Sequence, residues 1–170
     1  MFLNKIGDHG KGFVVFRLGD RECALPVSAV SEFVALPFLT RPPGLPPVIA
    51  GFFVLEATAI PVIRLDRLFD LPEQPPDSYT PLIVLKTGLP GTALLVDRIS
   101  GIVDVAPTSM LPVDESQTFN DCAVGEIVND GSAISVLDVE RLLLKKEHQC
   151  VAAFQAMEQK RMAEIERART

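Results

Sequence analysis

The chain has 170 residues, 48% of them hydrophobic, and a formal net charge of -6. This length favours one domain, or two small domains that share a core, and no apolar run is long enough for a membrane span. The charge is uneven, because residues 141–170 carry a balance of +3 and the rest of the chain a balance of -9. An acidic body argues against a nucleic-acid partner. No signal-peptide pattern opens the chain, so we expect a cytoplasmic protein without membrane insertion.

Three cysteines, Cys23, Cys122 and Cys150, lie at spacings that fit neither a zinc site nor a disulfide framework. The two histidines, His9 and His148, have no second histidine at a metal-ligand spacing. The sequence therefore predicts reduced thiols, no metal site and no cofactor.

The first half of the chain predicts a flexible N-terminus over residues 1–12, followed by β structure. Residues 13–18 and 22–27 alternate as a hairpin about a Gly-Asp turn, and residues 32–36 extend again after a single helical turn. A loop with five prolines covers residues 37–47. Residues 48–69 then read as two apolar strands about a turn, with a short amphipathic piece at the end.

The proline-rich residues 72–78 are the clearest break in the chain, and the second half repeats the first. Strands are predicted at residues 81–85, 92–96 and 102–105, with a further hairpin over residues 124–137. The last hairpin matches residues 50–63 at an offset of 74, and the earlier strands match at an offset of 69. The halves therefore read as two copies of one unit, with one β-barrel expected from residues 13–77 and another from residues 78–144.

From Asp138 onward the composition is that of a helix, since neither Gly nor Pro occurs again before Thr170. Asp138 is the expected cap of this helix over residues 138–170. We expect Leu142, Leu143, Val151 and Phe154 to pack on the body. The apolar positions beyond Phe154 keep no clean heptad, so a coiled coil is weakly supported.

No motif for catalysis or phosphate binding is present, so the sequence predicts a binding protein and not an enzyme. Asp66 and Asp97, each beside an arginine, fit the capping of short helical turns or surface pairing. A small enzyme with a site between the barrels is the alternative from another class. Its best candidate acid or base is Asp97.

Residues 48–69, VIAGFFVLEATAIPVIRLDRLF, resemble the hallmark of the CheW family of chemotaxis adaptor proteins, roughly V-x-G-x-x-N-L-R-G-x-x-x-P-V-x-D-L. Further matches at Phe16–Gly19, Val30–Glu32, Val96-Asp97 and residues 137–143 extend the resemblance over about residues 13 to 144. It implies a mostly β fold of two five-stranded SH3-like barrels, here followed by a long C-terminal helix. It also implies a non-catalytic adaptor that couples the chemoreceptor cytoplasmic tip to the regulatory domain of a CheA-type histidine kinase, in an array at the inner membrane.

Three positions depart from the family pattern. Glu56 stands where the family has arginine, Ala57 where it has the turn glycine, and Arg64 where it has aspartate. The family arginine belongs to the receptor- and kinase-facing surface, so a reversed charge there is expected to repel a standard partner. We also expect the paired change to preserve a salt bridge between Glu56 and Arg64 with its direction flipped.

The resemblance places partner contacts at Val30, Glu32 and Glu56 along one edge and near Ile99 and Val103 in the second barrel. The alternating pattern fits Val30, Ile99 and Val103 equally well as core residues. The alternative function keeps the fold but places the protein in a non-chemotactic signalling pathway, with an altered partner preference through Glu56. The helix is an added element for self-association or tethering.

Overall fold

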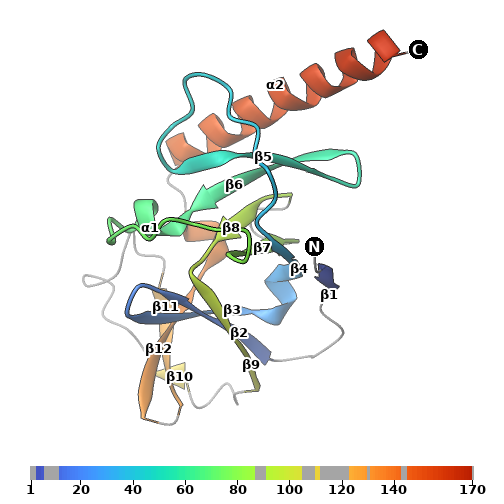
Figure 1. Cartoon of the computed structure of the whole chain (residues 1–170). Coiled ribbons are helices and arrows are strands. Elements are labelled where there is room, and N and C mark those ends of the chain that lie inside the picture. Colours follow the sequence, from blue (N-terminus) through green and yellow to red (C-terminus); the bar gives the residue numbers. More distant parts are fainter. Residues whose placement is uncertain are drawn as a thin grey trace.

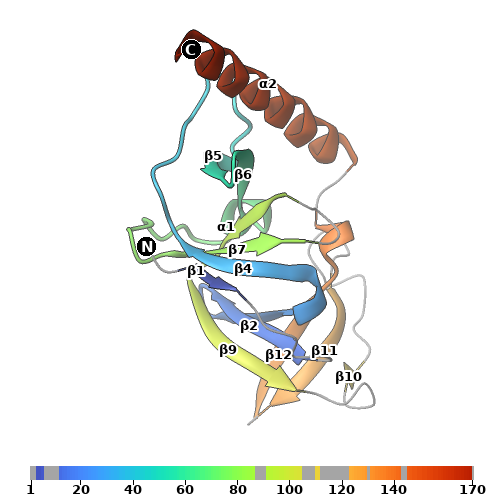
Figure 2. The same cartoon turned by 90° about the vertical axis from the view of Figure 1, so that its right-hand side faces the viewer.

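The computed structural model describes residues 3–5, 12–86, 91–104, 110–111, 123–129, 131–142 and 145–169. Two six-stranded sheets and a long C-terminal helix form the molecule. Figures 1 and 2 show the helix α2 above the first sheet, with the second sheet below it. The predicted fold is confirmed as mostly β with a C-terminal helix. Each sheet has the expected five main strands and one additional strand of three or two residues.

The first sheet, called sheet A here, consists in spatial order of β1 (Leu3–Lys5), β4 (Val30–Ala35), β7 (Pro81–Leu85), β8 (Ala93–Leu95), β6 (Thr58–Arg64) and β5 (Ile49–Leu55). Sheet B consists of β10 (Met110–Leu111), β11 (Ala123–Asn129), β12 (Ser132–Leu137), β3 (Arg21–Pro26), β2 (Gly12–Leu18) and β9 (Arg98–Asp104). Short helical pieces lie at Val27–Ala29 (η1), Leu65–Leu68 (α1) and Val139–Arg141 (η5). The helix α2 spans Lys145–Arg169.

The five main strands have the same spatial order in both sheets. The order β4-β7-β8-β6-β5 of sheet A is repeated by β9-β2-β3-β12-β11 of sheet B. The strands that correspond are those that the offsets of 69 and 74 match in the sequence. Each sheet also contains one parallel pair at the same place, β6 with β8 and β12 with β3. The internal repeat is therefore a structural repeat.

The two copies of the repeat exchange hairpins, so that each sheet contains one hairpin from the other copy. The hairpin β2–β3 from the first half pairs with β9 and β12 of the second half, and β7–β8 pairs with β4 and β6. Sheet membership therefore crosses the predicted boundary between residues 13–77 and 78–144. The physical reason is that β4 and β9 pair with the hairpin of the other copy, which no local sequence signal specifies.

The core has three parts, and the largest lies between the sheets. Phe16 and Leu25 of sheet B and Phe52 and Leu94 of sheet A are buried together there, with Val151 of α2 in the same cluster. A second cluster lies within sheet A and a third within sheet B. Both faces of β2 are consequently buried, which explains its nearly continuous apolar sequence.

The chain ends differ from the expectation in two places. Residues 3–5 of the predicted flexible N-terminus form β1, antiparallel to β4, because the open edge of β4 offers backbone hydrogen bonds. Asp138 caps the 3₁₀ turn η5 by accepting the Glu140 N–H at 3.0 Å, while the long helix begins at Lys145. Leu142 and Val151 are buried, and Phe154 packs on the core, as predicted. Leu143 lies outside the described residues.

Candidate interaction surface

The predicted contact residues of β4 lie in the interior of the molecule. Val30 has no exposed surface and belongs to the core between the sheets. Glu32 is 5% exposed, and its backbone lies opposite Lys5 of β1. A partner protein that approaches the folded chain does not reach either side chain. For Val30 the core alternative is therefore the one that the structure shows.

Ile99 and Val103 lie on β9 and are half-buried. Ile99 packs against the core between the sheets, and Val103 against the cluster within sheet B. The register shift at Ser100 resets the alternation of the strand, so Ile99 and Val103 point to opposite faces of sheet B. The exposed residues of β9 are 98, 100, 102 and 104, which alternate along the sequence with the half-buried residues 99, 101 and 103.

Glu56 is exposed at the turn between β5 and β6. This two-residue turn has positive φ at both of its central residues, 49° at Glu56 and 64° at Ala57. Such a turn prefers Asn-Gly, because left-handed backbone is unfavourable for residues with a Cβ. The side chain of Glu56 therefore projects from a tight hairpin whose conformation its own sequence does not favour.

The helix α2 holds this hairpin from one side. Gln159 Nε2 donates to the Ala57 carbonyl at 3.2 Å, and its Oε1 accepts the Ala59 N–H at 3.0 Å. Gln155 Nε2 donates to the carbonyls of Ala59 and Gly91 at 3.2 and 3.4 Å. Strand β8 pairs with β6 only from Val62 onward. The two side-chain amides therefore supply the hydrogen bonds of backbone groups before Val62 that have no neighbouring strand on that side.

The proposed salt bridge between Glu56 and Arg64 is wrong. Glu56 lies in the turn before β6 and Arg64 is the last residue of that strand, so the length of β6, roughly 20 Å at ~3.3 Å per residue, separates them. Arg64 instead forms a two-pronged ion pair with Asp66, with Nε to Oδ1 at 3.1 Å and Nη2 to Oδ2 at 2.7 Å. The side-chain hydrogen bond to Asp66 raises the pKa of Arg64 above its ordinary value, against the opposing effect of burial.

The internal repeat explains why Asp66 is needed. Arg64 corresponds at the offset of 74 to Asp138, which caps η5 with its own carboxylate. Arg64 lacks an acceptor for this purpose, and α1 has no side-chain cap from it. Asp66 takes part of the role by accepting the Arg67 N–H at 2.8 Å. This confirms the structural interpretation of Asp66.

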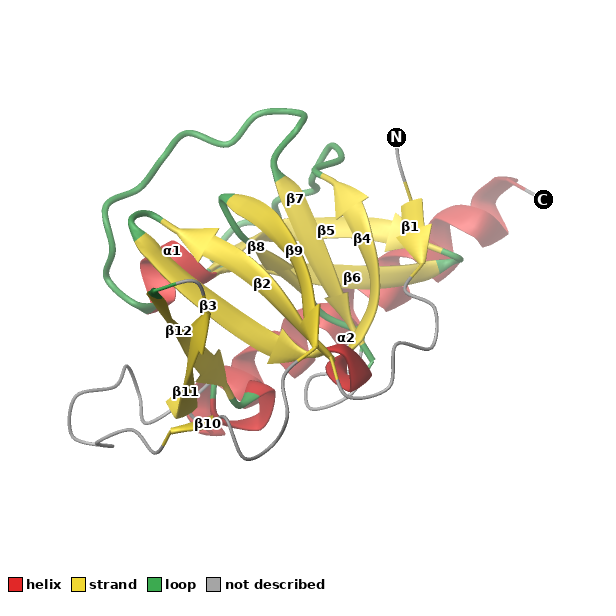
Figure 3. Ribbon diagram, turned by 90° about the horizontal axis from the view of Figure 1, so that it is seen from below, coloured by secondary structure: helices red, strands yellow, loops and turns green. Residues whose placement is uncertain are grey.

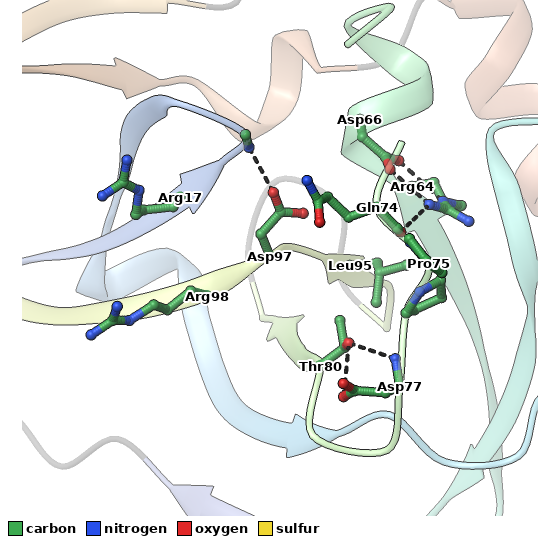
Figure 4. A pocket seen from close by; sticks show the side chains of 12 residues that line it. Arg17, Arg64, Asp66, Gln74, Pro75, Asp77, Thr80, Leu95, Asp97 and Arg98 are labelled. Atoms are coloured by element: carbon green, nitrogen blue, oxygen red, sulfur yellow. Dashed lines mark hydrogen bonds and ion pairs between the residues drawn. The ribbon is translucent and has the colours of Figure 1, made fainter. Parts of the chain in front are cut away.

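A cavity of about 430 Å³ lies where the two sheets meet, beside the Arg64–Asp66 pair. Figure 4 shows Arg17 and Arg98 at one rim, Asp97 and Gln74 nearer the centre, and Arg64 on the opposite wall. Asp97 accepts the Gly19 N–H at 2.6 Å and so fixes the β2–β3 turn. Its carboxylate thus has a structural role, although it holds a β-hairpin turn and not the helical turn that the sequence predicted.

Within the described residues, no group of three or more His, Cys, Asp or Glu side chains is placed to hold a metal ion. No helix in the same part of the chain is long and apolar enough to cross a membrane. Cys23 is buried and Cys150 half-buried, neither is in a disulfide bond within the described ranges, and Cys122 lies outside them.

The sequence model of the CheW-like domain matches residues 12–147. The chain belongs to the CheW-like family. The chemotaxis protein CheW of Helicobacter pylori is 27% identical over 78% of this chain and 81% of its own length. The CheW of Bacillus subtilis is 26% identical over 86% of this chain and 96% of its own.

A solved structure supports the same fold. The scaffolding protein TtCheW of Thermoanaerobacter tengcongensis superposes with a TM-score of 0.72 at 23% identity, covering 83% of this chain and 94% of that one. The CheW-like domain model ends at residue 147, so nearly all of α2 lies beyond it. The docked helix is therefore a feature that the family resemblance did not predict. The two glutamines that dock it carry no recognisable motif.

Proposed function

We propose that this CheW-like protein is a chemotaxis adaptor that couples chemoreceptors to a CheA-type histidine kinase. The observation that carries the proposal is the match of the CheW-like domain over residues 12–147. The relatives reported above are chemotaxis proteins by name, and the solved neighbour is a scaffolding protein. These names do not favour the alternative of a regulator in a non-chemotactic pathway.

The proposed adaptor acts by binding and has no catalytic step. Asp97, the best candidate for an acid or base, is hydrogen-bonded to the Gly19 backbone. The proposed partners are the regulatory domain of the kinase and the cytoplasmic tip of the receptor, and the proposed location is the cytoplasm beside a receptor array. The surfaces offered to them are exposed Glu56 and the exposed residues of β9, which alternate with Ile99 and Val103.

A calorimetric titration against the regulatory domain of the CheA-type kinase from the same cell tests the proposal. We expect the native protein to bind, and Glu56→Arg to change the affinity because it reverses the charge at an exposed turn. Glu164→Arg is the matched control, since Glu164 is exposed on the far part of α2. Failure of both the native protein and Glu56→Arg to bind would refute the adaptor proposal in this form.

Self-association through α2 is a separate part of the proposal. Residues 163–169 are exposed, and Figure 3 shows this end of the helix extending beyond the strands. Ile165 is exposed there, six residues past the docked Gln159. Sedimentation of the native chain and of Ile165→Lys measures the contribution of this end of α2 to self-association. An unchanged sedimentation coefficient at every concentration would remove self-association from the proposal.

A further inference from the structure

Strand β9 is an outer strand of sheet B. It pairs with β2 on one side, and no described residue pairs with its other edge. Its exposed side chains are those of Arg98, Ser100, Ile102 and Asp104. An edge strand of seven residues with an exposed isoleucine offers backbone donors and acceptors to another chain.

The repeated fold shows how the equivalent edge is covered. Strand β9 corresponds to β4, and the outer edge of β4 pairs with the antiparallel strand β1 over residues 32–34. These positions correspond at the offset of 69 to residues 101–103 of β9. Both strands also have an extra, unpaired serine just before this stretch, Ser31 in β4 and Ser100 in β9. The local backbone that receives β1 is thus present a second time.

Charges at the beginning of β9 favour a particular partner. Arg98 lies directly opposite Arg17 of β2, and like charges in this arrangement repel. Figure 4 shows both side chains extending to the same side, and no ion pair of either is formed among the described residues. Glu22 lies opposite Arg17 on its other side and offsets one charge in part. Asp97 is already hydrogen-bonded to Gly19.

We propose that the free edge of β9 binds an extended segment of a partner protein by antiparallel strand addition over residues 101–103. The segment carries an apolar residue beside Ile102 and, further toward its C-terminus, an acidic residue beside Arg98, which itself lies opposite Arg17. This order follows from the antiparallel direction, in which the partner chain runs from Val103 toward Arg98. A carboxylate on this strand lies beside Arg98, on the side of β9 away from β2, where it forms charge-assisted hydrogen bonds with the Arg98 guanidinium and offsets its repulsion from Arg17.

The proposal deepens the adaptor function by naming the chemistry of one partner segment, and its test does not require the kinase. The probe is a synthetic eight-residue peptide of alternating Val and Thr that ends in two Glu, added to the ¹⁵N-labelled full chain. We expect slowed amide exchange at residues 101–103 and shifted Nε–Hε resonances of Arg17 and Arg98. Arg98→Glu is expected to weaken the binding about tenfold, and Ile102→Lys to abolish it.

Val128→Lys is the matched control, because Val128 is an exposed β-branched residue on β11 of the same sheet. It should leave the peptide affinity unchanged. Three outcomes would overturn the proposal: no change in exchange at residues 101–103, equal binding of a peptide that ends in two Lys, or equal shifts of both arginines by inorganic phosphate alone. Loss of kinase binding with intact peptide binding would count against the adaptor proposal and leave this one standing.

Discussion

Gln159 of α2 and Ala59 of β6 are hydrogen-bonded across 100 positions of the sequence, with the Ala59 N–H donating to Oε1 at 3.0 Å. Nε2 of the same amide donates a hydrogen bond to the Ala57 carbonyl, so both polar atoms of the Gln159 side chain are hydrogen-bonded to the hairpin. Together with Gln155, one helical turn earlier, it takes the place of a missing neighbouring strand.

Gln159→Ala should loosen α2 from β6. Removal of two partly exposed hydrogen bonds to backbone groups is expected to lower the free energy of unfolding by about 1–2 kcal/mol. Amide exchange of Ala59 should accelerate at the same time. Gln149→Ala is the control, since Gln149 is exposed on the same helix. Unchanged exchange at Ala59 in Gln159→Ala would show that the helix is held by its apolar contacts instead.

Gly51→Ala should be strongly destabilising. Gly51 has φ of 151°, and an added Cβ would lie 2.8 Å from the Thr40 carbonyl oxygen and 2.9 Å from the Leu39 Cβ. We expect a loss of about 2 kcal/mol or more, from the strained φ and from overpacking. Gly44→Ala isolates the cost of the strained φ, because Gly44 has φ of 81° and open space around the added Cβ. Denaturant unfolding of both variants separates the two costs, and equal losses would contradict the predicted clash.

Asp66→Ala should be costly because it leaves Arg64 without its carboxylate partner. The pair is about nine-tenths buried on both sides, and breaking such a pair from one side costs about 3 kcal/mol. Glu73→Ala removes the partner of the exposed Arg67 ion pair and should cost less than about 1 kcal/mol. Thermal unfolding of the two variants checks the ranking, and a Glu73 variant as unstable as the Asp66 variant would be inconsistent with it.

Arg64 itself should add no pH dependence around neutrality. Its pKa is raised, chiefly by the hydrogen bond to Asp66, so its contribution is present below the unfolded pKa and lost only as pH rises through the still higher folded pKa. Arg64→Met should therefore change the level of stability around neutral pH without changing its slope there. Urea unfolding at several pH values measures the slope, and a slope that differs from that of the native chain would contradict the assignment.

Ala57→Gly should stabilise the chain. Ala57 has φ of 64°, a left-handed conformation that costs a residue with a Cβ about 1–2 kcal/mol. Glycine relieves this cost but loses more entropy on folding, so the net gain should be about 0.5–1 kcal/mol. Ala59→Gly is the control, because Ala59 is buried in a regular strand and its replacement should destabilise. A lower melting temperature for Ala57→Gly than for the native chain would count against the strain.

The sequence predicts strands, turns and the repeat well because these depend on local alternation and on turn residues. The hairpin over residues 49–64 and its counterpart over 123–137 are examples. The exchange of hairpins between sheets depends on which strand edges meet in space, and β2 would alternate in the same way in either sheet. The pairing of β1 escaped prediction because a three-residue strand has no measurable period.

The candidate interaction surface could be predicted less well from the sequence. Val30 and Glu32 matched a family motif, yet a motif does not distinguish a residue that contacts a partner from one that fills the core. The pairing of Arg98 with Arg17 could not be predicted from the sequence, because the register between β2 and β9 places residues 81 positions apart opposite each other. Among the predicted contact residues, Glu56 was both flagged by its departure from the family and found exposed.

The exchanged hairpins have a consequence for how such a chain can arise and be divided. A single copy of the repeated unit has strands that find their neighbours only in another copy, so one copy alone completes a sheet by assembling with a second molecule. Covalent linkage turns that concentration-dependent assembly into an intramolecular step, at an effective concentration of the order of millimolar. Two halves cut at residue 77 should therefore be unfolded apart and regain β structure on mixing.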